Sequence, residues 1–140
     1  MKNFKEQKQE IIERAKKAEA CKAEFQKAVN AENITELIKV VKDNLKWSIN
    51  TGMLNAKSLE DIFGIDFLKD NHIYTSGENN IRITEGNAFI YTLDSSSANV
   101  KTWGSSKIQA KVEGINSFIR NHNTRTISVK KDNFTIEIIN

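Results

Sequence analysis

The sequence predicts an α+β fold, with helices in the N-terminal half and short strands in the C-terminal half. Residues 3–30 contain no Gly or Pro and are rich in Ala, Glu, Lys and Gln, which favour helix. Two further segments begin with residues typical of helix starts. From His72 onward, apolar and polar residues alternate between turn-forming residues, as in short strands. No linker separates the halves, so residues 1–140 are expected to form a single domain.

Residues 1–30 are expected to form one long basic helix with two distinct faces. One face is apolar at the helical period, and it contains Phe4, Ile11, Ala15, Ala18, Phe25 and Val29. This stripe either packs on its own chain or forms a heptad seam with a partner helix. The opposite face carries Lys2, Lys5, Lys16 and Lys27, with glutamates beside them. These lysines could contact phosphates, or form an ordinary solvated face of mixed charge.

Residues 31–70 are expected to form two shorter helices. The segment Asn33-Ile34-Thr35-Glu36 fits a capping box, and Gly52 is the predicted stop of the helix that follows. Trp47 falls at a core position of this helix and is expected to be packed. The next helix is expected to start at Ser58-Leu59-Glu60-Asp61, with Gly64 inside it.

Residues 71–140 are expected to form a β region of short strands. The expected segments are His72–Thr75, Asn80–Thr84, Ala88–Leu93, Ala98–Trp103, Lys107–Val112, Ser117–Arg120, Thr126–Lys130 and Phe134–Ile138. An antiparallel sheet and a β-solenoid both produce strands at this spacing, and both alternatives stay open. The last two segments favour a hairpin.

Three consecutive segments of this region can be superposed, namely Ala88–Asp94, Ala98–Gly104 and Ser106–Val112. They share the pattern small–x–β-branched–x–small–x, followed in two of them by Gly or Asp. The pattern resembles that of short-repeat proteins encoded in bacterial genomes and mobile elements. The resemblance implies a β-solenoid and no particular activity.

Composition excludes several classes of protein. The chain is 39% hydrophobic and 28% charged, with a net charge of +3, which excludes a disordered chain, an acidic nucleic-acid mimic and a histone-like polycation. Lys, Asn and Ile have A/T-rich codons and account for more than a third of the residues, which suggests a bacterial or phage genome. No apolar segment fits a secretory signal or a membrane span, so the expected location is the cytoplasm, without a membrane partner.

No catalytic motif is present in the sequence. Cys21 is the single thiol and is expected in the middle of a helix, and the histidines His72 and His122 lack the spacing of metal ligands. We therefore expect no enzymatic activity, no cofactor and no metal site.

Protein binding is the remaining expectation. In size and composition alone, the chain resembles phage-encoded inhibitors of host defence, including anti-CRISPR proteins. That resemblance implies steric binding to an RNA-guided nuclease or its guide RNA. The alternatives are a homo-oligomeric assembly protein, joined through the first helix or the C-terminal strand, and a weak RNA- or DNA-binding protein using the basic helix. The candidate partner-binding residues are Lys2, Lys5, Lys16, Lys27, Trp103, Arg120 and Arg125.

Overall fold

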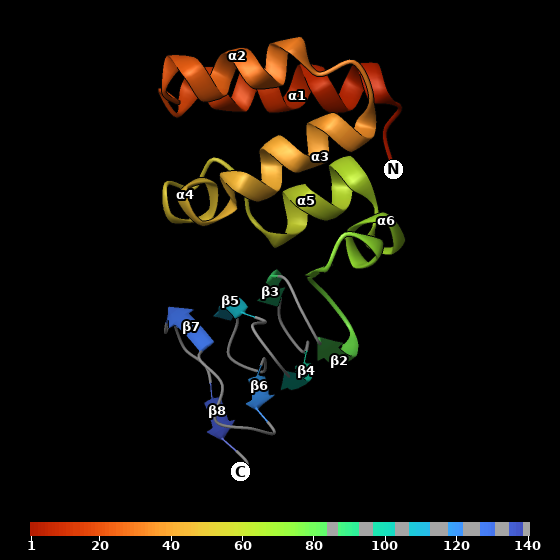
Figure 1. Ribbon diagram of the computed structural model, residues 1–140, viewed down its shortest axis with the longest axis vertical. Coiled ribbons are helices and arrows are strands. Elements are labelled where there is room, and N and C mark those ends of the chain that lie inside the picture. The colour runs from red at the N-terminus through yellow and green to blue at the C-terminus, as the bar shows by residue number, and fades with distance from the viewer. Residues whose placement is uncertain are drawn as a thin grey trace. The chain divides into compact units, whose positions relative to one another are not determined.

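The α+β fold is confirmed by the computed structural model, in which helices precede strands (Figure 1). The structure describes residues 1–83, 87–92, 97–102, 107–112, 118–121, 127–130 and 135–138. The chain divides into two compact units, Met1–Gly64 and Ile65–Asn140, where the sequence suggested one domain. We call them the helical unit and the strand unit. The division falls before the last helix, which therefore groups with the strands.

The predicted long helix over residues 1–30 is wrong, because a turn interrupts it. α1 (Phe4–Lys17) and α2 (Lys22–Asn30) lie side by side (Figure 1). Between them, Glu19 has a φ of 56°, in the left-handed region that reverses the chain direction. Local propensity gives no sign of this turn, since Ala, Lys and Glu continue through it.

Two backbone hydrogen bonds close the turn after α1. The N–H of Glu19 donates to the carbonyl of Lys16 at 3.1 Å, and the N–H of Ala20 donates to the carbonyl of Ala15 at 3.0 Å. This pair of bonds is the Schellman motif, in which the left-handed position is usually glycine. A glutamate holds that position here, which is why the sequence hides the helix end.

The predicted start of the next helix, α3 (Ile34–Asp43), is confirmed. The side chain of Asn33 accepts a hydrogen bond from the backbone N–H of Glu36 at 2.9 Å. The Glu36 carboxylate accepts from the N–H of Glu32 at 2.7 Å, one residue before the expected partner. The first bond satisfies a donor that the first turn of a helix leaves unpaired, and the second ties the preceding residue to that turn.

The helix expected to run as far as Gly52 is divided in two by Asn44. α3 ends there, and α4 (Leu45–Asn50) begins directly after it. The Asn44 side chain donates to the carbonyl of Val40 at 2.9 Å, and its φ of −113° departs from helical values. Gly52, with a φ of 80°, lies where the sequence predicted the stop.

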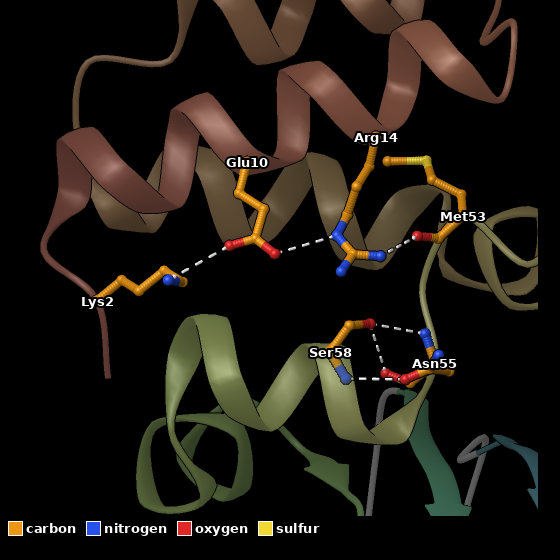
Figure 2. A network of polar contacts seen from close by, with 6 residues as sticks. All are labelled: Lys2, Glu10, Arg14, Met53, Asn55 and Ser58. Atoms are coloured by element: carbon orange, nitrogen blue, oxygen red, sulfur yellow. Dashed lines mark hydrogen bonds and ion pairs between the residues drawn. The ribbon is translucent and has the colours of Figure 1, made fainter.

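The next helix, α5 (Ala56–Phe63), starts earlier than predicted. Asn55 is its N-cap and Ser58 its third residue, and each side chain accepts from the other's backbone N–H at 2.8 Å (Figure 2). Gly64, with a φ of 80°, ends α5 instead of lying within a longer helix, and α6 (Ile65–Asp70) follows it. The helix start predicted at Ser58 is therefore wrong by one turn.

The core of the helical unit lies among α1, α3, α4 and α5. Its largest fully buried side chains are Leu37, Leu45, Leu54, Leu59, Ile62 and Phe63. On α1, Ile11 and Ala15 are only 2% and 5% exposed within the single chain. The apolar stripe of this helix thus packs on its own chain, which decides between the two interpretations left open by the sequence.

The strands form two parallel sheets. The first has the order β1-β3-β5-β7 and the second β2-β4-β6-β8, and every pairing between described strands is parallel. Their bounds are β1 (Ile73–Tyr74), β2 (Glu78–Ile83), β3 (Asn87–Thr92), β4 (Ser97–Thr102), β5 (Lys107–Val112), β6 (Phe118–Asn121), β7 (Ile127–Lys130) and β8 (Thr135–Ile138). The antiparallel alternative is wrong, including the hairpin over residues 126–138, because β7 pairs with β5 and β8 with β6.

The register shows that the repeating unit is two strands long. Ala88 is in register with Ile108, twenty positions later, whereas the sequence pattern superposed it on Ala98 and Ser106. Each strand pairs with the second strand after it, because parallel neighbours need a long connection and cannot be joined by a tight turn. The segments that connect the strands from β2 onward lie outside the described residues, so the solenoid stays a prediction.

Burial in the strand unit follows the alternation expected of strands. On β2 and β4, the buried residues are Asn79, Ile81, Ala98 and Val100, whereas Asn80, Arg82 and Lys101 are exposed. The register places Ile81 beside Val100 and Arg82 beside Lys101. On these two strands, one face is therefore buried and the other carries polar side chains.

Candidate functional site

The helical unit contains an apolar pocket of about 310 Å³, which is the candidate functional site. Its walls come from α1, α2, α3, α4 and the segment after α4. The lining residues are Ile11, Ala15, Ala20, Cys21, Glu24, Phe25, Ala28, Val40, Val41, Asn44, Trp47, Ser48, Met53 and Leu54. Most of these side chains are apolar, so the pocket suits an apolar group.

Arg14 fixes the wall formed by the segment after α4. Its guanidinium donates to the carbonyl of Met53 at 3.0 Å and to the Glu10 carboxylate at 3.2 Å (Figure 2). Lys2 approaches the other oxygen of Glu10 at 3.7 Å. This network ties α1 to the residues beside the pocket, and Met53 itself lines it.

Trp47 lies on α4 and is 39% exposed, so the expectation that it is packed is wrong. Because a helix turns about 100° per residue, Trp47 lies on the side away from the buried Leu45 in the helix that follows Asn44. α4 restarts there and buries Leu45, Ser48 and Ile49 instead. The indole thus lines the pocket while part of its surface stays exposed to solvent.

Glu24 is the one acidic side chain in the lining of this pocket, and two partners hold it. The amide of Asn44 donates to one carboxylate oxygen at 2.9 Å, and Lys27 contacts the other at 2.9 Å. The Asn44 hydrogen bond, followed by that of Lys27, lowers the pKa of the Glu24 carboxyl. Glu24 in turn raises the pKa of the Lys27 ammonium. The residue is therefore a fixed anion in neutral solution, linking α2 to α3 and α4.

The four candidate lysines do not form one face. Lys5 and Lys16 are exposed on α1, and Lys2 precedes that helix in an ion pair with Glu10. Lys27 lies on the separate helix α2 and pairs with Glu24. The single basic face required the long helix that the turn at Glu19 interrupts.

Of the three candidate residues in the strand unit, the structure places one. Arg120 lies on β6, in register with Asn99 of β4. Trp103 and Arg125 lie outside the described residues. The predicted binding residues thus fall in both units, and none of those in the described ranges lines the pocket. The one local signal for it is Asn44, because asparagine inside a helical pattern often marks a helix end.

Cys21 is the N-cap residue of α2, and its thiol is exposed at the pocket. His72 is exposed after α6 with a φ of 60°, and His122 lies outside the described residues. Within the described ranges, no three His, Cys, Asp or Glu side chains are grouped as metal ligands.

In the part of the chain that the structure describes, no helix combines the length and the apolar character that crossing a membrane requires. Comparisons of the chain with protein-family models, with curated proteins and with solved structures found no match.

Proposed function

We propose that this chain is a non-enzymatic protein-binding module whose helical unit receives apolar side chains of a partner protein. The observation that carries the proposal is the apolar pocket beside the partly exposed Trp47. Tryptophans beside apolar pockets are enriched among the residues that dominate binding energies at protein interfaces. A volume of about 310 Å³ accommodates one or two large side chains.

The fixed charges support a protein partner over a nucleic acid at this site. Glu24 is an ionised carboxylate in the lining, and it neutralises Lys27. Lys2 is paired with Glu10 in the same way. A phosphate backbone needs unneutralised cations, and anions nearby weaken its attraction.

For the class of partner, we propose a host defence nuclease of the RNA-guided kind, bound in the cytoplasm and blocked sterically. This part of the proposal rests on the small size, the Lys/Asn/Ile-rich composition and the resemblance to phage and mobile-element proteins. Assembly through the first helix loses support, since the apolar face of α1 is buried within its own chain. Assembly through the C-terminal strand stays a prediction.

The test is a tagged pull-down from bacterial cells that carry RNA-guided defence, with and without nuclease treatment, followed by mass spectrometry. Three proteins are compared: the wild type, Trp47→Ala, and the matched control Lys46→Ala, which removes an exposed side chain from the same helix outside the pocket lining. We expect the wild type and the control to recover the nuclease equally, and Trp47→Ala to lose at least tenfold in affinity.

Recovery must survive nuclease treatment, and the recovered complex must cleave its target more slowly than the free enzyme. Equal recovery by Trp47→Ala would overturn the role of the pocket. Recovery that disappears with nuclease treatment would overturn direct binding to protein.

A further inference from the structure

The pocket of the helical unit has a charged group in its mostly apolar lining, the carboxylate of Glu24. Among the described residues that line it, none is Lys, Arg or His. The Glu24 side chain is 29% exposed, so a group that enters the pocket covers a carboxylate that still contacts water. Removing a charge from water is costly unless an opposite charge replaces the lost hydration. An occupant with a cation next to its apolar part therefore fits this lining better than a purely apolar one.

Lys27 contacts the Glu24 carboxylate from outside the pocket. Its ammonium lies 2.9 Å from one carboxylate oxygen, yet Lys27 is not a lining residue and its side chain is 62% exposed. Exposed ion pairs of this kind, within one helix, contribute little to stability. The amide of Asn44 donates to the other oxygen at 2.9 Å and holds the carboxylate independently of Lys27. Since a carboxylate accepts up to about four hydrogen bonds, a second cation can join or replace Lys27 while Glu24 keeps its place.

Aromatic rings in the same lining also favour a cation. Trp47 and Phe25 both line the pocket, and Trp47 is 39% exposed. The face of an aromatic ring attracts ammonium and guanidinium groups, and tryptophan attracts them most strongly. A carboxylate and two aromatic rings thus line one apolar pocket, and this combination of groups suits a basic side chain that accompanies an apolar one.

We propose that the partner segment bound by this pocket presents an apolar side chain together with a neighbouring lysine or arginine, whose cation contacts Glu24. The inference rests on the proposed function, because it specifies the chemistry of the partner that the pocket receives. The apolar side chain fills the cavity of about 310 Å³, and the adjacent cation reaches the carboxylate and the exposed part of the Trp47 indole. Proteins that bind RNA carry basic residues for its phosphates, so the proposed class of partner offers such segments.

The test compares three probes that share one apolar chain and differ in charge, namely hexylammonium, hexanol and hexanoate. Binding is followed by Trp47 fluorescence at low salt and neutral pH, in a Trp103→Phe background that leaves Trp47 as the single tryptophan. We expect hexylammonium to bind at least tenfold more tightly than hexanoate, with hexanol between them. In Glu24→Gln, which keeps an acceptor for the Asn44 amide, the two charged probes should bind within about threefold of each other.

The control variant Glu32→Gln removes an exposed acid outside the lining, changes the net charge equally and should keep the preference for hexylammonium. Unchanged binding of hexanol by Glu24→Gln would show that this variant keeps its pocket. Equal binding of hexylammonium and hexanoate by the wild type, with hexanol still bound, would overturn the cationic segment and leave the apolar pocket of the proposed function standing. The same loss of preference in Glu32→Gln would overturn the role of Glu24. Failure of all three probes to bind would overturn the pocket itself.

Discussion

Helix ends in the helical unit are set by side chains close by in the sequence, whereas strands in the strand unit are aligned with partners far along the chain. Asn33 and Asn55 each bond a backbone N–H three residues later. Ile81, in contrast, is in register with Val100, nineteen positions later. The first kind of information is short-range and can be read from a few residues. The second depends on which strands become neighbours.

The two units also differ in the neighbours of their charged residues. In the helical unit, Lys2 and Lys27 each have an acidic partner, at 3.7 and 2.9 Å. In the strand unit, Arg82 and Lys101 are set beside one another by the register.

The largest expected loss of stability comes from truncating a side chain in the core of the helical unit. Leu59 is fully buried, at 0% exposure, so Leu59→Ala removes apolar contacts and leaves a cavity. We expect the free energy of unfolding to fall by about 2–5 kcal/mol, measured by urea unfolding followed by far-UV circular dichroism. Leu59→Met nearly conserves volume and should cost less than about 1.5 kcal/mol. Similar losses for both variants would contradict close packing around this side chain.

The alternation of buried and exposed residues along β4 predicts a smaller effect on the free energy of unfolding. Val100 is fully buried and its neighbour Asn99 is not, so Val100→Ala should cost about 2 kcal/mol, from the lost methyl groups and the cavity. Asn99→Ala should cost no more than about 0.5–1 kcal/mol, the value of one exposed hydrogen bond. Urea unfolding together with hydrogen exchange of the β2 and β4 amides measures both. The reverse order of costs would mean that β4 is shifted by one residue from the register that pairs Val100 with Ile81.

Features of the fold that depend on nearby residues could be predicted from the sequence, whereas features that depend on distant residues could not. The start of α3 at Asn33 and the stop at Gly52 were predictable, because a cap acts on its own turn. Strand positions were predictable from the alternation of apolar and polar residues, but the parallel pairing was not. Successive strands share the same pattern of small and β-branched residues, so the pattern does not show which two strands lie next to each other. A repeat read strand by strand superposes Ala88 on Ala98 of the next strand, whereas the register partner of Ala88 is Ile108, on the second strand after it.

The pocket was not predictable, since it depends on an interruption of an otherwise regular helical pattern. Without the turn at Glu19, α2 would continue α1 and could not pack beside it. This interruption rests on Glu19, which the surrounding Ala, Lys and Glu residues do not distinguish.

The smallest predicted effect is a gain in stability at such an interruption. Glu19 has a φ of 56° at the left-handed position of the turn, which costs a residue with a side chain roughly 1 kcal/mol. Glycine avoids this cost but gives the unfolded chain more freedom. We therefore expect Glu19→Gly to raise the free energy of unfolding by about 0.5–1 kcal/mol, measured by urea unfolding. Glu19→Ala keeps the strained backbone and should bring no gain.

The strand unit offers a matched position at His72, which has a φ of 60° directly after α6. Its carbonyl accepts a hydrogen bond from the N–H of Phe89 at 2.9 Å, a backbone contact that a substitution preserves. His72→Gly should therefore gain stability by the same amount as Glu19→Gly, because the cost belongs to the backbone angle and not to the unit around it. A gain at Glu19 and a loss at His72 would show that the histidine side chain contributes contacts that outweigh its strain. That result would show that the end of α6 depends on side-chain contacts around His72, whereas the end of α1 does not depend on the side chain of Glu19.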